Sequence, residues 1–186
     1  MAGFTEKAIK ASFMKLLNEK PLKQISVRDI VDGCGVNRNT FYYHFQDIPS
    51  LIGSIIKDDA DRIMKENPRF TSIEECLNTA IVFSLENQRA ILHIYRSVNR
   101  DIFEQYQWRV CDYVVTSYFD EILKDRNVSD KDRKVLITYG TCLCFGVIIG
   151  WLENDLSEDI NKLIHRLCIL KQGELDRMID ICERSR

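Results

Sequence analysis

Apolar residues recur at helical spacing along most of the chain, so that each predicted helix has one hydrophobic face. The first such stretch follows Thr5, whose hydroxyl can cap a helix, and ends at Pro21. Its apolar positions, three and four residues apart, are Ile9, Phe13, Leu16 and Leu17. Alternating polar and apolar runs, which would indicate strands, do not compete with this pattern. The chain is therefore predicted to be all-α.

A tight turn joins the next two predicted helices. Ser26 and Asp29 form a capping-box pattern at the start of the first of them. Gly35 can adopt the left-handed conformation that ends this helix, and Asn37 can cap the next helix two residues later. Helices joined this tightly must cross at a sharp angle.

The helix after this turn is predicted to run from about Arg38 to Phe45. Phe41 and Phe45 lie one turn apart and are expected on the buried side, which leaves a polar face outside. A short helix, a glycine turn and a second short helix with a polar face form a helix-turn-helix unit.

Longer helices are predicted for the rest of the chain. A helix that begins at Asp47 and ends before Asn67 and Pro68 is expected to bury Leu51, Ile52, Ile55, Ile56 and Ile63. Later helices are predicted over residues 72–85, 88–97, 101–124, 129–154 and 157–184, and Gly173 can interrupt the last.

The stretch from Val135 to Leu152 has no charged residue and is just long enough to suggest a membrane span. It contains polar residues, two cysteines and three glycines, so it is interpreted instead as a helix buried on all sides within a protein. The membrane alternative, which would require detergent for extraction, is disfavoured.

Composition favours a cytosolic protein of one domain or two small ones. The 186 residues include seven cysteines, which form no Cys-x-x-Cys pair of the kind that binds zinc or carries out redox chemistry. They are predicted to be buried thiols in a reducing compartment, with redox sensing as the alternative. The first residues do not resemble a signal peptide, so a cytoplasmic location is expected. No metal or cofactor is expected.

The charge is unevenly distributed along the chain. The formal net charge of −2 is not typical of a nucleic-acid-binding protein. Residues 1–50, however, carry seven Lys and Arg against five Asp and Glu, whereas residues 51–186 carry nineteen against twenty-three. This distribution has the sign expected if only the N-terminal part contacts phosphate.

The segment from Ile25 to Leu51 reads ISVRDIVDGCGVNRNTFYYHFQDIPSL and resembles the DNA-binding domain of the TetR/AcrR family of bacterial regulators. The S-V-R-D-I entry, the G-V turn and the T-F-Y-Y-H-F helix carry this resemblance. It implies a DNA-binding domain over residues 1–46 and a helical domain for effector binding and dimerisation over residues 47–186. It also implies DNA contacts at Arg28, Asn37, Arg38, Asn39, Thr40, Tyr42, Tyr43 and His44. The family commonly has a lysine after this helix, but this chain has Ile48, so weaker or less salt-dependent binding is expected.

Side-chain chemistry suggests distinct roles for the implied DNA contacts. Arg38 and Asn39 can reach base edges from the N-terminal end of a helix in the major groove. Thr40, Tyr42 and His44 can donate hydrogen bonds to phosphate oxygens and so fix the docking register. Packing roles for the tyrosines and a structural role for the histidine remain alternatives.

The C-terminal half resembles the family less specifically, through the pattern from Gly146 to Asn154 followed by Ser157. In that family the last two helices pair with those of a second subunit. The resemblance thus implies a homodimer on pseudo-palindromic double-stranded DNA, with half-sites about 34–36 Å apart. The interface is predicted to include Cys142, Phe145, Gly146, Ile149, Leu163, Leu167 and Leu170, with intramolecular packing as the alternative.

Aromatic residues between these elements are numerous enough to line an effector cavity of the kind found in the family, although ordinary core packing is the alternative for most of them. The candidates are Phe83, Phe103, Tyr106, Trp108, Tyr113, Tyr118 and Tyr139.

The leading hypothesis is a homodimeric repressor that a small-molecule effector releases from its operator. The alternative is a coregulator or activator of the same fold that responds to a protein partner. An enzyme is disfavoured, because the sequence has no phosphate loop, metal cluster or nucleophile motif, and His93 and His165 are isolated.

Overall fold

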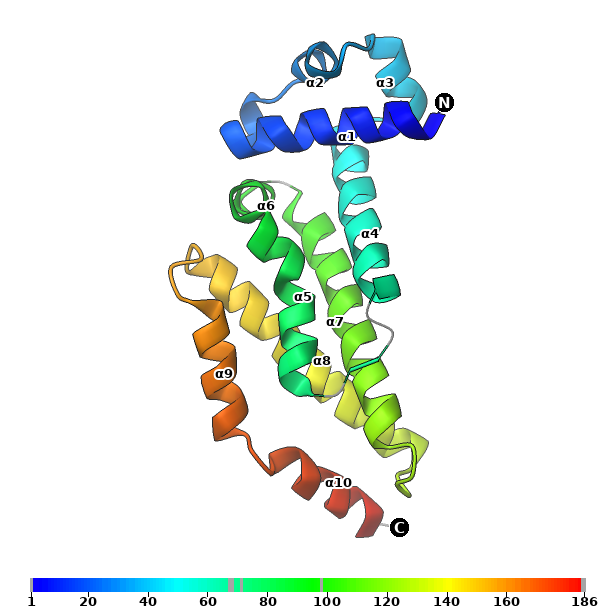
Figure 1. The fold of residues 1–186 in the computed structure, drawn as a ribbon, viewed down its shortest axis with the longest axis vertical. Coiled ribbons are helices and arrows are strands. Elements are labelled where there is room, and N and C mark those ends of the chain that lie inside the picture. Colours follow the sequence, from blue (N-terminus) through cyan, green and yellow to red (C-terminus); the bar gives the residue numbers. More distant parts are fainter. Residues whose placement is uncertain (1, 67–68, 71, 98, 185–186) are drawn as a thin grey trace. The chain divides into compact units, whose positions relative to one another are not determined.

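The computed structural model describes residues 2–66, 69–70, 72–97 and 99–184, and over these residues every regular element is helical (Figure 1). The all-α prediction is confirmed. The elements are α1 (Ala2–Glu19), the short 3₁₀ helix η1 (Leu22–Gln24), α2 (Val27–Cys34), α3 (Arg38–His44), α4 (Ile48–Glu66), α5 (Ile73–Glu86), α6 (Gln88–Tyr95), α7 (Arg100–Ile122), α8 (Asp130–Glu153), α9 (Ile160–Leu170) and α10 (Glu174–Arg184).

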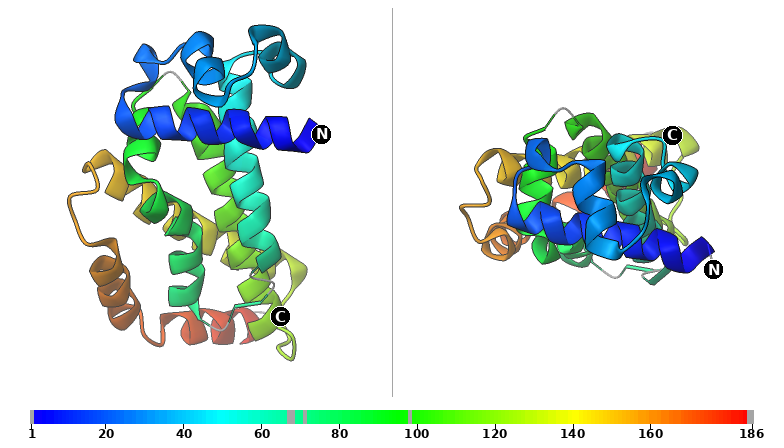
Figure 2. Two further views of the ribbon diagram at one scale, coloured as in Figure 1. Left: turned by 45° about the horizontal axis from the view of Figure 1, so that its top comes forward. Right: turned by 90° about the horizontal axis from the view of Figure 1, so that it is seen from above.

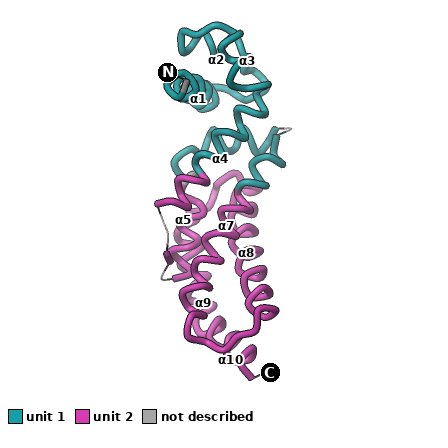
Figure 3. Tube along the Cα trace, turned by 90° about the vertical axis from the view of Figure 1, so that its right-hand side faces the viewer, with its two compact units in different colours: residues 1–59, 84–106 teal, residues 60–83, 107–186 magenta. Residues whose placement is uncertain are grey.

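The chain divides into two compact units (Figure 3). The first comprises residues 1–59 and 84–106, and the second comprises residues 60–83 and 107–186. The boundaries between these ranges fall within α4, α5 and α7. The domain boundary predicted after residue 46 falls within the first unit, and the division of functions along the chain remains a prediction.

In the first unit, α1 packs against α2 and α6 through a face that is fully buried at Ile9, Phe13 and Leu17. The helix begins at Ala2, so the predicted start at Thr5 was wrong; a hydroxyl cap is only one of several ways to begin a helix. A side-chain contact holds α6 against the C-terminal end of α1, where His93 Nδ1 lies 2.7 Å from the carbonyl oxygen of Leu17. Figure 2 shows α1, in blue, alongside the short helices that follow it.

The first part of α4 belongs to the same unit and buries the predicted apolar stripe. Leu51, Ile52, Ile55 and Ile56 are all buried. Lys10 Nζ of α1 lies 2.6 Å from Asp58 Oδ2 on the exposed side of α4. This ion pair links α1 to α4.

The second unit has a core made by α5, α7 and α8. Gly140 of α8 allows close packing, because a Cβ at this position would lie only 2.8 Å from Val115 of α7. A buried and a half-buried polar side chain form hydrogen bonds inside the unit. The buried Gln107 Nε2 donates to the carbonyl oxygen of Ala80 at 2.7 Å, and the half-buried Tyr113 hydroxyl donates to that of Met64 at 2.8 Å. These contacts satisfy groups that would otherwise be costly to bury.

Helix α8 corrects one prediction. This helix is long and apolar enough to cross a membrane by composition, but it has one buried face and one exposed face. Leu136, Cys144 and Ile148 are buried, whereas Cys142 is exposed and the side chain of Val135 is 59% exposed. The prediction of a helix buried on all sides is therefore wrong for the single chain, because α5 and α7 cover only one side of it.

The last predicted helix is split in two. Gly173 has φ +75°, a left-handed conformation that interrupts the helix between α9 and α10 (Figure 1). Asp159 caps α9 by accepting hydrogen bonds from the backbone N–H groups of Asn161 and Lys162, so this helix begins later than predicted. The resulting bend places α10 at an angle to α9 within the second unit.

Candidate DNA-binding interface

A capping box starts α2, as the sequence predicted. The Ser26 hydroxyl accepts a hydrogen bond from the backbone N–H of Asp29, and the Asp29 carboxylate accepts one from the backbone N–H of Ser26 at 2.8 Å. The hydrogen bonds from the backbone and side chain of Ser26, with that of Lys20 in support, lower the pKa of Asp29. The carboxylate is therefore ionised at neutral pH, and the box fixes where α2 begins.

Helices α1 and α2 approach each other closely where two small residues meet. The buried Ser12 hydroxyl of α1 donates a hydrogen bond of 2.7 Å to the carbonyl oxygen of Ile30 in α2. A Cβ at Gly33 would lie 2.5 Å from this hydroxyl oxygen. Glycine at position 33 thus preserves the hydrogen bond that sets the position of α2 on α1.

The turn between α2 and α3 has the predicted geometry. Gly35 ends α2 with φ 70°, and its backbone N–H donates to the carbonyl oxygen of Val31. Two residues later, Asn37 Oδ1 accepts hydrogen bonds from the backbone N–H of Thr40 at 2.8 Å and from its hydroxyl at 3.0 Å. The glycine and the asparagine together set the crossing of the two helices.

Helix α3 has a buried aromatic side and an exposed polar side. Phe41 is 0% and Phe45 5% exposed, which confirms their predicted place in the core, and their ring centroids lie 5.8 Å apart. Tyr42 is 55% exposed and Tyr43 81% exposed. The phenylalanines anchor α3 so that the polar side faces away from the unit.

The residues predicted to contact DNA lie on the outer surface of α2 and α3. The exposed ones are Arg28, Asn37, Arg38, Asn39, Tyr42 and Tyr43, and the half-buried ones are Thr40 and His44. Three are also engaged within the protein: the Thr40 hydroxyl donates to Asn37 Oδ1, and Arg28 Nε lies 3.5 Å from Asp32 Oδ2. A DNA phosphate must compete with these contacts, so the positions remain predictions.

The residues of the predicted dimer interface lie in the second unit, on α8 and α9. Those that are exposed are Cys142, Gly146, Leu163 and Leu170, and those that are half-buried are Phe145, Ile149 and Leu167. Phe145 also contacts the ring of Trp108 at a centroid distance of 5.4 Å. Their pairing with a second subunit stays a prediction.

The structure separates most of the aromatic residues predicted to line an effector cavity. Phe103 is fully buried in the first unit beside Tyr95, and Tyr106 lies in the same unit near Gly53. Tyr113 bonds to Met64 in the second unit. The side chain of Phe83 lies outside the described part of the chain.

Among the candidates whose side chains the structure describes, Tyr118 and Tyr139 line a cavity in the second unit. Sequence reasoning missed Lys171 and Glu174, which lie beside them. In the sequence, these two residues appear only as opposite charges on either side of Gly173. Such charged pairs are common on surface helices, so this pair does not by itself indicate a cavity.

Two family profiles match the chain. The profile for bacterial regulatory proteins of the tetR family matches residues 11–55, which contain the helix-turn-helix. A profile for the C-terminal region of transcriptional regulators matches residues 71–173, more than half of the chain. The chain belongs to the TetR family of transcriptional regulators.

This TetR-family chain is similar to particular members of the family. It is 28% identical to the HTH-type dhaKLM operon transcriptional activator DhaS of Lactococcus lactis, over 90% of this chain and 92% of DhaS. It is 34% identical to the regulator EthR of Mycobacterium tuberculosis over 41% of this chain, which covers 38% of EthR.

Solved structures show the same fold. The dihydroxyacetone kinase operon activator DhaS superimposes with a TM-score of 0.75 over 96% of this chain and 98% of that chain, at 22% identity. Salmonella enterica GusR superimposes with a TM-score of 0.58 over 88% of this chain and 92% of that chain, at 15% identity. The family resemblance drawn from the residues is confirmed, and family membership identifies a DNA-binding transcriptional regulator rather than an enzyme.

Proposed function

We propose that the chain is a homodimeric, sequence-specific regulator that inserts α3 of each subunit into the major groove of a pseudo-palindromic operator. The observation that carries this proposal is the outward polar side of α3, anchored by Phe41 and Phe45. Arg38 and Asn39 would read base edges, and Tyr42 and its neighbours would bind phosphate. We expect the protein to act in the cytoplasm.

Binding to DNA taken from upstream of the protein's own coding region tests this proposal. Fluorescence anisotropy of labelled duplexes should show saturable binding, and Arg38→Ala should weaken specific binding by about tenfold or more. Arg89→Ala is the matched control, because Arg89 is also exposed in the first unit but lies on α6. Equal losses in the two variants, or no binding even in dilute salt, would contradict the proposal.

The exposed face of α8 supports a homodimer. It presents Val135, Cys142 and Gly146 to solvent, and α9 adds the exposed side chains of Leu163 and Leu170. An apolar surface of this kind is typical of an interface, and its small residues allow helices to approach closely. A dimer also places its two short recognition helices on two half-sites at once, which raises the affinity of the protein for the operator.

Analytical ultracentrifugation of a charged variant tests the dimer. A Cβ at Gly146 would meet no atom within 4 Å, so Gly146→Arg should leave the single chain folded but convert the dimer to a monomer. Gly3→Arg is the matched control, because Gly3 has the same free space in the first unit. A Gly146→Arg variant that sediments as a dimer would refute this interface.

The direction of regulation was left open by the sequence, and the match to DhaS favours activation. DhaS, which matches over 90% of this chain, is a transcriptional activator. We therefore place activation ahead of repression. A promoter–reporter fusion in a deletion strain distinguishes them, because expression should fall without an activator and rise without a repressor.

A further inference from the structure

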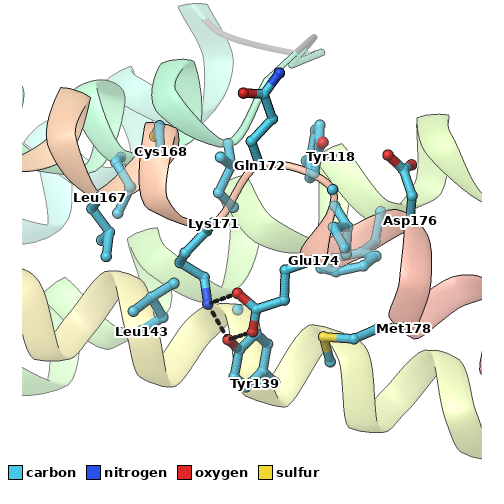
Figure 4. A pocket seen from close by; sticks show the side chains of 16 residues that line it. Tyr118, Tyr139, Leu143, Leu167, Cys168, Lys171, Gln172, Glu174, Asp176 and Met178 are labelled. Carbon is cyan, nitrogen blue, oxygen red and sulfur yellow. Dashed lines mark hydrogen bonds and ion pairs between the residues drawn. The ribbon is translucent and has the colours of Figure 1, made fainter.

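A cavity of about 230 Å³ lies in the second unit, at the bend between α9 and α10 (Figure 4). Side chains from α5, α7, α8, α9 and α10 line it. Its apolar walls include Ile73, Leu77, Phe119, Leu143, Leu167 and Met178. A pocket of this size is smaller than the roughly 300–1,000 Å³ of sites for drug-sized ligands, so it suits a small molecule.

Polar groups are concentrated at one place in the cavity. Lys171 Nζ lies 2.5 Å from Glu174 Oε2, and the Tyr139 hydroxyl donates to Glu174 Oε1 at 2.9 Å. Lys171 also donates to the Tyr139 hydroxyl, so these three side chains form a closed polar cluster (Figure 4). This Lys171–Glu174–Tyr139 cluster offers both hydrogen-bond donors and acceptors.

The charges at this cluster disfavour a charged ligand. A ligand anion near Lys171 would be repelled by Glu174, and a ligand cation near Glu174 would be repelled by Lys171, since the two groups are in direct contact. A hydroxyl group can donate to the carboxylate and accept from the ammonium without either penalty. Burial raises the pKa of Tyr118, which leaves its hydroxyl uncharged at neutral pH.

Helix α10 is held in place over the cavity from both ends. At its start, Glu174 is bound by Lys171 and Tyr139. Near its end, Arg126 donates to Asp180 at 2.7 Å and to Glu183 at 2.9 Å. These contacts orient the helix that forms one wall of the cavity.

We propose that this cavity binds an uncharged, mainly apolar small molecule whose single hydroxyl group hydrogen-bonds to the Lys171–Glu174–Tyr139 cluster. The presence of the site does not depend on DNA binding, whereas a role for its ligand as an effector rests on the function proposed above. Leu167 lines the cavity and also belongs to the predicted dimer interface, which gives a bound molecule a direct route to the pairing of subunits.

Three naphthalene probes that differ only in their polar group test the proposal by isothermal titration calorimetry on the full chain. We expect 2-naphthol to bind saturably at one site per chain, and more tightly than 2-naphthoate or 2-naphthylmethylammonium. Tighter binding of either charged probe, or no saturable binding of 2-naphthol, would overturn it.

Two substitutions locate the bound probe. Tyr139→Phe removes one hydroxyl from the cluster and should weaken 2-naphthol binding about fivefold, as expected for the loss of one hydrogen bond. Tyr113→Phe is the matched control, because it removes a hydroxyl from the same unit outside the cavity. Leu143→Trp should fill the cavity and abolish binding. Equal affinity of wild type and both cavity variants would refute the site.

Anisotropy with operator DNA on the same preparations separates this proposal from the one before it. If the chain binds 2-naphthol but no DNA, the cavity proposal stands and the proposed regulatory function is refuted. If the chain binds DNA but calorimetry shows no binding of 2-naphthol, the regulatory function stands and the cavity proposal is refuted.

Discussion

Replacement of Asn37 by alanine separates the structural role of this residue from its predicted DNA contact. In the structure, Asn37 Oδ1 accepts hydrogen bonds from the backbone N–H and the hydroxyl of Thr40 at 2.8 and 3.0 Å. Loss of a helix N-cap costs about 1 kcal/mol, which corresponds to roughly a fivefold larger open population of α3. Hydrogen–deuterium exchange of the Thr40 amide should therefore quicken at least fivefold, because this N–H also loses its acceptor.

Asn37→Asp is the matched variant for the cap, because a carboxylate oxygen can accept the same two hydrogen bonds. It should keep the slow exchange at Thr40 but weaken operator binding, since it places a negative charge on the surface predicted to face phosphate. Unchanged amide exchange in Asn37→Ala would refute the capping argument. Unchanged DNA affinity in Asn37→Asp would exclude Asn37 from the DNA interface.

Three further changes have expected outcomes. Gly35→Ala should lower the free energy of unfolding by about 1–2 kcal/mol in urea, because alanine is strained at φ 70°, and Gly35→Asn should cost less. Burial raises the pKa of the Cys76 thiol from 9.0 to about 12. The free energy of unfolding should therefore fall as the pH rises through this interval, because the thiol ionises in the unfolded chain but not in the folded one. Cys76→Ala should reduce that fall, as measured by urea titrations above and below pH 9.0. Arg126→Gln should accelerate hydrogen exchange in α10, because it removes the bonds to Asp180 and Glu183, and unchanged exchange would show that they do not hold the helix.

The sequence alone determined the helix-turn-helix, because its signals are local. The capping box at Ser26, the left-handed Gly35 and the Asn37 cap each involve residues no more than four positions apart. The spacing of Phe41 and Phe45 likewise specifies which side of α3 is buried. Such features act within one turn of helix, so they can be recognised without knowledge of the rest of the fold.

Only the tertiary structure decided which face of α8 is exposed. The helix has no charged residue between Val135 and Leu152, so its sequence pattern does not distinguish a face that packs on α5 and α7 from a face that meets solvent. The cavity was equally beyond sequence reasoning, because it requires Lys171 and Glu174 to meet Tyr139. Tyr139 lies more than thirty positions earlier in the chain, so that meeting depends on how α9 and α10 fold back onto α8.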